Sequence, residues 1–169
     1  MTFHLDEIDL KLLLHLQKNS RMSLRELSHE IHLSDSSVRS RIQRLETEGY
    51  IKQYTAILNK VMIKRNLVSF TGIRLKENNY STTIYFLDKL REVPGVYNCY
   101  YVNGMFDFLL HMVVGDMQEY YNTLVHILAK INGVSRITTF FVLNEMEGEK
   151  LIDLSHLKSG YRRYRKRLH

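Results

Sequence analysis

A short stretch of the sequence concentrates hydroxyl and guanidinium side chains whose chemistry suits contact with a nucleic acid. Serine hydroxyls bond to phosphates and base edges at close approach, and an arginine guanidinium can form two hydrogen bonds to one guanine. An ordinary solvated helix face carries the same residue types, so the surrounding elements must decide between the two interpretations. The polar side of this stretch carries Ser36, Ser37, Ser40, Gln43, Arg44 and Thr47, with Arg39 and Arg41 on its flanks.

Residues 22–49 are predicted to form two short helices with a tight turn between them, which would present these side chains. Ser23 and Glu26 make a capping box at the start of the first helix, and Ser34 is a favourable N-cap for the second. Gly49 stands where a left-handed residue would end the second helix. Apolar residues recur at helical spacing on one side of each helix, namely Leu24, Leu27 and Ile31, then Val38, Ile42 and Leu45.

A further helix over 4–19 and a strand over 50–58 complete the predicted N-terminal domain. The helix has an apolar stripe, and residues 50–58 are β-branched and aromatic, as is typical of a strand or wing. These elements predict a winged helix-turn-helix over 1–55, followed by a linker over 56–66. The linker contains basic residues that either touch phosphates or belong to a solvated hinge, namely Lys60, Lys64 and Arg65.

From residue 67 the sequence alternates between strand and helix patterns in the order β-α-β-β-α-β. The two helices end alike, at Val93-Pro94-Gly95-Val96 and at Ile131-Asn132-Gly133-Val134. Such paired βαβ halves predict a C-terminal ferredoxin-like βαββαβ (RAM-type) domain over 67–147, and hence an α+β protein. The strands are expected over 67–76, 96–102, 106–114 and 134–143, and the helices over 81–93 and 116–131.

Both faces of the predicted sheet are apolar, although its two helices can cover only one of them. In the strand over 106–114, one side carries Phe106, Phe108, Leu110, Met112 and Val114, and the other carries Asp107, Leu109, His111 and Val113. A face this apolar is rarely left open on a monomer, so it is expected to pack against a second subunit. A dimer also suits a helix-turn-helix, because two reading helices can then engage two half-sites.

The amino-acid composition indicates a folded protein without a disulfide or a membrane span. The chain has 169 residues, 44% hydrophobic and 25% charged, which is ordinary for a folded protein. Its single cysteine, Cys99, excludes an intramolecular disulfide and a cysteine-based metal cluster, and fits a reducing cytoplasm. Because no apolar stretch is long enough to span a bilayer, we expect a cytoplasmic protein without a membrane partner.

The net charge of +6 comes from residues 158–169, the last part of the C-terminal extension expected over 148–169. Residues 1–55 carry eight Lys/Arg and eight Asp/Glu, and residues 56–157 carry ten of each. Residues 158–169 carry six Lys/Arg and no acid, interspersed with apolar residues at helical spacing. This basic amphipathic stretch either packs on a neighbouring subunit and contributes charge toward DNA, or remains a disordered solubilising end.

These motifs together resemble the Lrp/AsnC (feast/famine) family of transcription regulators over about residues 4–146. The resemblance rests on Leu5-Asp6-Glu7-Ile8-Asp9, on Leu33-Ser34, and on the run from Arg41-Ile42-Gln43-Arg44 to Gly49-Tyr50-Ile51. Tyr54-Thr55-Ala56 and the loop Gly104-Met105-Phe106-Asp107-Phe108 extend it. The family implies an N-terminal DNA-binding domain, a C-terminal ligand-sensing domain, dimers assembling into octamers or similar rings, and amino-acid effectors bound between dimers.

By this resemblance the DNA contacts fall on Ser34, Ser36, Ser37, Arg39, Ser40, Arg41 and Arg44. Arg41 can instead brace its helix against neighbouring helices. The effector residues fall on Tyr101, Asn103, Gly104, Met105, Phe106, Asp107, Thr138 and Thr139. Amides of a glycine-containing turn can take the carboxylate of an amino acid, and Asp107 can take its ammonium group. Alternatively, Asp107 serves only the amides of its own turn.

Catalysis is the competing class of function. Some proteins with this two-domain plan are decarboxylases acting on sirohaem-type tetrapyrroles, using histidine and arginine. Here His111 and His126 lie in the sheet domain with no arginine clustered beside them, and a lone histidine is more often a core or interface residue. We therefore expect a regulator of double-stranded DNA rather than an enzyme, with no metal and no cofactor.

Overall fold

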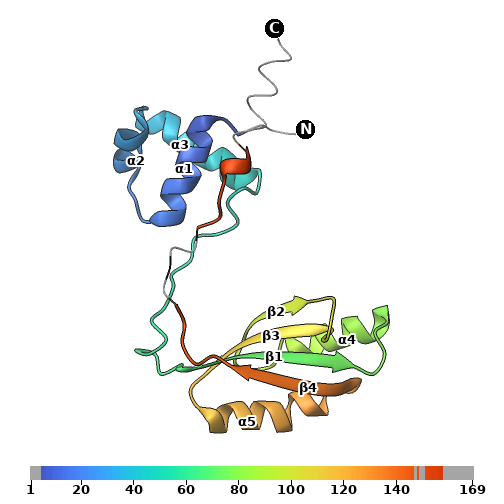
Figure 1. Cartoon of the computed structure of the whole chain (residues 1–169). Coiled ribbons are helices and arrows are strands. Elements are labelled where there is room, and N and C mark those ends of the chain that lie inside the picture. Colours follow the sequence, from blue (N-terminus) through green and yellow to red (C-terminus); the bar gives the residue numbers. More distant parts are fainter. Residues whose placement is uncertain (1–4, 147, 149–150, 158–169) are drawn as a thin grey trace. The chain divides into compact units, whose positions relative to one another are not determined.

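The computed structural model of the protein describes residues 5–146, 148 and 151–157. The chain divides into two compact units, Met1–Ala56 with Glu147–His169, and Ile57–Met146 (Figure 1). Within the described residues, no helix is long and apolar enough to cross a membrane. The C-terminal extension expected over 148–169 is described only at 148 and 151–157, so its basic part from Lys158 onward lies outside the described residues.

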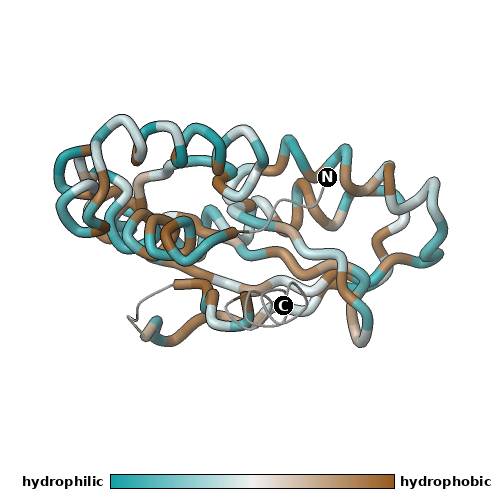
Figure 2. Tube along the Cα trace, turned by 90° about the horizontal axis from the view of Figure 1, so that it is seen from above, coloured by the Kyte–Doolittle hydropathy of each residue, from teal (hydrophilic) through white to brown (hydrophobic). Residues whose placement is uncertain are grey.

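Three helices make the first unit: α1 (Glu7–Lys18), α2 (Leu24–Ile31) and α3 (Asp35–Thr47). Each begins at a capping side chain, and capping boxes form at Asp6 for α1 and at Ser23 for α2. His32, in the left-handed conformation (φ 57°), ends α2 and turns the chain toward α3. The helices bury a shared apolar core formed by Leu12, Leu27, Ile31, Val38 and Leu45. Hydrophobic and hydrophilic positions alternate in short blocks along the helical parts of the chain (Figure 2), as expected for helices with one buried side.

The strand predicted over 50–58 does not form. This segment follows α3 without any strand pairing, and it is held to the helix instead. The Ile51 amide donates to the Leu45 carbonyl (3.1 Å), and the Tyr54 hydroxyl donates to Glu46 Oε1 (2.8 Å). Partial burial and the Glu46 bond raise the pKa of Tyr54 to about 12. β-branched and aromatic residues form a strand only beside another strand, and this unit of three helices offers none.

The second unit has the predicted β-α-β-β-α-β order, which confirms the ferredoxin-like fold. Its elements are β1 (Leu67–Leu75), α4 (Tyr80–Leu90), β2 (Val96–Tyr101), β3 (Phe108–Val114), α5 (Met117–His126), the short 3-10 helix η1 (Leu128–Lys130) and β4 (Val134–Phe141). The strands lie in the order β2-β3-β1-β4, and all pairings are antiparallel. The helix expected over 116–131 is instead divided at Ile127: α5 ends before this residue and η1 begins after it.

One face of the sheet is buried by the helices, and the other carries exposed aromatic rings. The buried core includes Ile73, Phe86, Phe108, Leu110, Met112 and Leu128. On the opposite face, Phe70 and Tyr97 pack against His111, with ring centroids 5.0 and 5.2 Å apart, and Tyr97 and Phe140 are 73% and 54% exposed. We call this the open sheet face.

The prediction that Phe106 shares the side of Phe108 is wrong. β3 begins only at Phe108, because the Asp107 amide donates to the Ile73 carbonyl (2.9 Å) and the Asp107 carbonyl accepts from Val102. The turned backbone sends the Phe106 ring to the open sheet face, where it covers Gly72 and meets the Phe140 ring edge-on at 6.2 Å. A Cβ at Gly72 would lie 2.5 Å from that ring, so glycine permits this close approach.

Candidate DNA-binding helix and effector loop

The helix α3 presents a stripe of polar side chains to solvent. Val38 and Leu45 are fully buried on its inner side. On the other side, the exposed residues recur at helical spacing and are Ser36, Arg39, Ser40, Gln43 and Thr47. We call these five residues the α3 stripe. Gln43 and Thr47 belong to the polar side expected from the sequence, although the family resemblance assigned no DNA contact to them; their spacing from Ser36 and Ser40 places them on the same helix face.

The serines at the start of α3 form a local network. Ser34 is the N-cap, and its hydroxyl accepts from the Ser37 amide (3.3 Å) while donating to the Ser37 hydroxyl (2.9 Å). Ser36 Oγ lies 3.1 Å from Ser34 Oγ. All three serines are exposed. The network fixes the first turn of α3, and the start of a helix is a position that suits contact with a phosphate.

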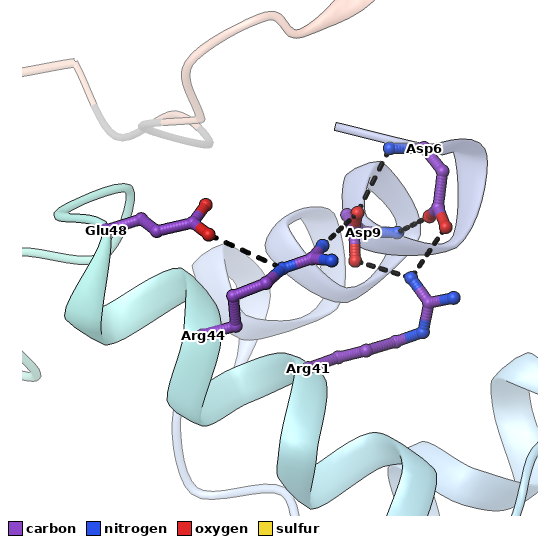
Figure 3. Close-up of polar contacts among 5 residues, drawn as sticks. All are labelled: Asp6, Asp9, Arg41, Arg44 and Glu48. Atoms are coloured by element: carbon purple, nitrogen blue, oxygen red, sulfur yellow. Dashed lines mark hydrogen bonds and ion pairs between the residues drawn. The ribbon is translucent and has the colours of Figure 1, made fainter. Parts of the chain in front are cut away.

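Arg41 and Arg44 extend from the other flank of α3 to acidic residues at the start of α1 (Figure 3). Arg41 Nη1 lies 2.6 Å from Asp6 Oδ2 and 2.7 Å from Asp9 Oδ1. Arg44 Nη2 lies 2.5 Å from Asp9 Oδ2, and its Nε lies 4.0 Å from Glu48. One carboxylate therefore holds two arginines from successive turns of α3, an arrangement that we call the Asp9 bridge.

The Asp9 bridge is largely removed from water. Asp9 is 0% exposed, and the Arg41 and Arg44 side chains are 26% and 40% exposed. Burial alone would raise the pKa of Asp6, but hydrogen bonds from the Asp9 amide and from Arg41 outweigh it and lower that pKa. Burial opposes the charged form of Arg41 too, yet Asp6 and Asp9 raise its pKa overall.

Of the two roles open to Arg41, this geometry supports bracing, and it extends that role to Arg44. A guanidinium that already bonds to a buried carboxylate is less available to a base edge. The α3 stripe and Ser34 and Ser37 remain exposed and form the surface that can approach DNA. Its long side chains are Arg39 and Gln43, the types that bond to guanine and to adenine.

The loop between β2 and β3 brings together most of the candidate effector residues. Gly104 has a φ of 143°, and its carbonyl accepts from Arg74 Nη1 (3.0 Å). The Tyr101 hydroxyl donates to Asn78 Oδ1 (3.0 Å). Asn103 and Met105 are exposed at the loop tip, and Met105 is 80% exposed. The loop is thus braced at both ends and open at its tip.

The Asp107 carboxylate connects the β2–β3 loop to the end of β1. Asp107 is 5% exposed. Its carboxylate accepts hydrogen bonds from the Leu75 amide (2.8 Å) and from Asn78 Nδ2 (2.8 Å). Arg74 Nε lies 3.9 Å from Oδ2. Both oxygens therefore have protein partners, and these come from the end of β1 and the residues after it rather than from the amides of its own turn. The carboxylate ties the loop to β1, which leaves little room for a ligand ammonium group.

Thr138 and Thr139 do not belong to one site in a single protomer. Adjacent strand residues point to opposite faces, and Thr139 Oγ1 hydrogen-bonds to the Tyr120 hydroxyl on the helix side. That hydroxyl also lies 3.1 Å from Thr71 Oγ1. Thr138 pairs with Gly72 and therefore shares the open sheet face with Phe106. Across the described residues, no cluster of three or more His, Cys, Asp or Glu could hold a metal ion.

Family models match both units of the chain. A winged helix-turn-helix DNA-binding model matches residues 5–52, and an Lrp/AsnC ligand binding domain model matches residues 68–151. The leucine-responsive regulatory protein of Escherichia coli K12 is 34% identical over 143 residues, which cover 85% of this chain and 87% of that protein. The protein of the same name from Klebsiella pneumoniae matches equally, with the same identity and coverage.

Solved structures give the same result for the fold. A transcriptional regulator from Neisseria meningitidis, crystallised with L-methionine, has a TM-score of 0.85 at 30% identity, covering 90% of this chain and 99% of that chain. An AsnC family transcriptional regulator from Agrobacterium tumefaciens has a TM-score of 0.83 at 26% identity, with the same coverage. The similarity therefore extends through both units rather than through one shared domain.

Proposed function

Because the chain belongs to the Lrp/AsnC family of transcriptional regulators, we propose that its α3 stripe reads operator DNA while an amino acid at the β2–β3 loop controls assembly. As a member of this family, it is a sequence-specific DNA-binding regulator that responds to a small effector, and we assign its work to the cytoplasm.

The observation that supports the reading role is the combination of a rigid inner side of α3 with an uncommitted outer side. The Asp9 bridge fixes the helix at two successive turns. The five residues of the α3 stripe face solvent without any bond to another element. A pre-positioned helix loses less conformational entropy when it enters a major groove, so more of its contact energy appears as affinity.

The reading role is tested by binding the purified protein to duplex DNA from its own upstream region while salt is varied. Arg39→Ala should weaken binding and reduce the dependence of affinity on salt, because an exposed guanidinium of α3 is removed. Lys11→Ala removes an exposed positive charge from α1 in the same unit and serves as the matched control. Equal losses in both variants would argue against a specific role for α3.

We propose that the effector is an apolar amino acid held at the tip of the β2–β3 loop. Glycine-turn amides there can bind its carboxylate, and Met105, which is exposed at the loop tip, can contact an apolar side chain. The related Neisseria regulator is crystallised with L-methionine, so methionine and leucine are the first probes. Because Asp107 already has two donors, we assign it to shaping the loop, and the ligand ammonium group then needs an acceptor from a neighbouring protomer.

We propose that the open sheet face forms the dimer and that effector binding between dimers favours a higher assembly, such as an octamer. This face carries exposed rings at Tyr97 and Phe140, and apolar side chains gathered on one exposed face are typical of a subunit interface. An effector that binds one assembly better shifts the population toward it, and so changes how many α3 helices face DNA at the correct spacing. Calorimetry and sedimentation with each amino acid test this step.

We propose no enzymatic role. His111 packs between the rings of Phe70 and Tyr97, which occupies the histidine expected of a tetrapyrrole decarboxylase. Burial raises the pKa of the Cys99 thiol to about 11, so it stays protonated at neutral pH and is a poor nucleophile. Titration with a sirohaem-type tetrapyrrole should leave its absorption spectrum unchanged, whereas a spectral shift would revive the enzyme alternative.

A further inference from the structure

Two arginines lie opposite each other on the open sheet face, where β1 and β4 run side by side (Figure 1). Arg74 of β1 pairs directly with Arg136 of β4, two positions along from the pair of Gly72 and Thr138. Opposed residues on adjacent strands, and residues two apart on one strand, share a sheet face. Both arginines are exposed, and we call them the arginine pair.

A β-bulge follows the arginine pair and ends the regular ladder there. The register shifts after Arg74, because the next residue, Leu75, pairs with Val134. Ser135 is thus the extra residue of the bulge, and its hydroxyl donates to the Arg74 carbonyl (3.0 Å). The arginine pair therefore occupies the last regular position between β1 and β4, with its backbone tied in place.

Arg74 extends from this position to the β2–β3 loop. Its Nη1 donates to the Gly104 carbonyl (3.0 Å), and its Nε lies 3.9 Å from Asp107 Oδ2. Within the described residues, the backbone amides of residues 103–106 donate to no protein acceptor. One guanidinium of the pair is thus in contact with the loop that we propose as the effector site, beside amides that are open to a ligand.

The positive charge of the arginine pair is not cancelled by its surroundings. The carboxylate beside Arg74 is that of Asp107, and it already accepts from the Leu75 amide and from Asn78 Nδ2. Arg136 forms no ion pair with the part of the chain that the structure describes. Like charges directly opposite each other destabilise a sheet, and an anion bound between the two guanidiniums would remove that cost.

We propose that the arginine pair binds the α-carboxylate of the amino-acid effector, together with the open amides of the β2–β3 loop. This inference rests on the proposed function of that loop. A guanidinium can form two parallel hydrogen bonds to a carboxylate, and such charge-assisted bonds are stronger than those from neutral amides. Arg74 aligns the loop with the pair, and Arg136 makes the main contact with the carboxylate.

The first test compares calorimetric affinities for L-methionine and for L-methioninol, in which a hydroxymethyl group replaces the carboxylate. Arg136→Gln should weaken L-methionine binding roughly tenfold or more, as expected for a lost charge-assisted hydrogen bond. L-Methioninol should bind the wild type and Arg136→Gln with equal, low affinity. L-Leucine and L-leucinol serve as a second pair of probes.

Two further variants show whether the effect is specific. Arg136→Lys keeps the charge but loses the planar fork, so its affinity for L-methionine should lie between those of the wild type and Arg136→Gln. Arg91→Gln removes a guanidinium at the end of α4 whose side chain is 82% exposed, and is the matched control. Arg91→Gln should bind L-methionine as the wild type does.

The second test needs no amino acid. Removing one of two opposed positive charges should relieve their repulsion, so Arg136→Gln should raise the midpoint of thermal unfolding at low salt, and the gain should shrink as salt is added. Sodium acetate should raise the wild-type midpoint above its value in sodium chloride of equal ionic strength. This difference should be smaller in Arg136→Gln and unchanged in Arg91→Gln. Equal differences in all three proteins would overturn the arginine pair as a carboxylate site.

The outcomes separate this inference from the proposed function. If no amino acid binds the wild type, the proposed effector role of the loop fails, and this inference fails with it. If L-methionine or L-leucine binds the wild type and Arg136→Gln equally well, the effector role stands and the arginine pair is overturned as its carboxylate site. If Arg136→Gln changes the sedimented mass and leaves the affinity unchanged, the pair contacts a second copy of the chain instead, which also overturns it.

Discussion

Asp9 is a fully buried carboxylate shared by two arginines from successive turns of another helix. A buried charge persists only when partners compensate its lost hydration, and here each partner is itself partly exposed. The bridge thus makes the orientation of α3 depend on one side chain of α1. Substituting Arg44 would disturb this bridge as well as any DNA contact, so Arg39 is the cleaner probe of DNA reading.

Asp9→Asn should destabilise the DNA-binding unit by roughly 2–4 kcal/mol, because two guanidiniums lose a charged partner. The value is below the full cost for a buried pair, since Arg41 and Arg44 are 26% and 40% exposed and water partly compensates them. Glu30→Gln, which removes an exposed carboxylate of α2, is the control. Urea unfolding followed by circular dichroism measures the stability of both variants. Equal unfolding midpoints for Asp9→Asn and Glu30→Gln would contradict a stabilising role of the Asp9 bridge.

Asp6 gives the unit an acid-sensitive contribution to stability. Its folded-state pKa lies below the ordinary value of 3.8, so the unfolded chain binds the proton first as pH falls. The contribution is complete above pH of about 4 and is lost as pH falls toward the lower folded-state value. The stability difference between wild type and Asp6→Asn should therefore shrink below pH 4. A stability difference between the two proteins that stays constant from pH 6 to pH 3 would contradict this acid-sensitive contribution of Asp6.

At the scale of elements, the sequence predicted helices and strands where local signals and burial agree. The capping residues Ser23 and Ser34 and the apolar spacing located α2 and α3 closely. The strand expected over 50–58 failed because strand formation depends on a partner, which local sequence cannot supply. Phe106 was assigned to the wrong face for a similar reason, since the Asp107–Ile73 hydrogen bond turns the backbone.

The site residues also differ in whether local sequence is enough to predict their surroundings. Spacing along α3 was enough to find its exposed serines and Arg39, because a helix face follows from sequence position. The partners of Arg41, Arg44 and Asp107 come from distant parts of the chain, so their bracing roles could not be predicted with certainty. Thr138 and Thr139 could have been separated in advance by strand alternation alone.

Gly72→Ala should destabilise the sheet unit by about 1–3 kcal/mol, because the added methyl group would lie 2.5 Å from the Phe106 ring. In a Phe106→Ala background the same substitution should cost much less, since the space is then free. Thermal unfolding of the wild type, of each single variant and of the double variant gives the coupling energy between Gly72 and Phe106. Equal costs in both backgrounds would mean that the ring does not cover Gly72.

At the scale of the whole molecule, the open sheet face is the feature that a single protomer leaves unexplained. Phe140→Asp should break the proposed dimer, since a buried unpaired carboxylate is costly at an interface. Tyr80→Asp changes an aromatic residue that is 83% exposed on α4, and is expected to leave the assembly unchanged. Sedimentation equilibrium measures both masses, with circular dichroism as the check on folding. A folded Phe140→Asp protein of wild-type mass would contradict this interface, and Tyr97→Asp provides a second variant.

The central claim is that the outer side of α3 reads base sequence, and the most direct measurement is selection of preferred duplexes from a random DNA pool. Wild-type protein, Gln43→Ala and the matched control Gln118→Ala are compared at one salt concentration. We predict that wild type and Gln118→Ala select one motif, and that Gln43→Ala loses preference at defined positions of it. An unchanged motif for Gln43→Ala and for Arg39→Ala would contradict base reading by α3.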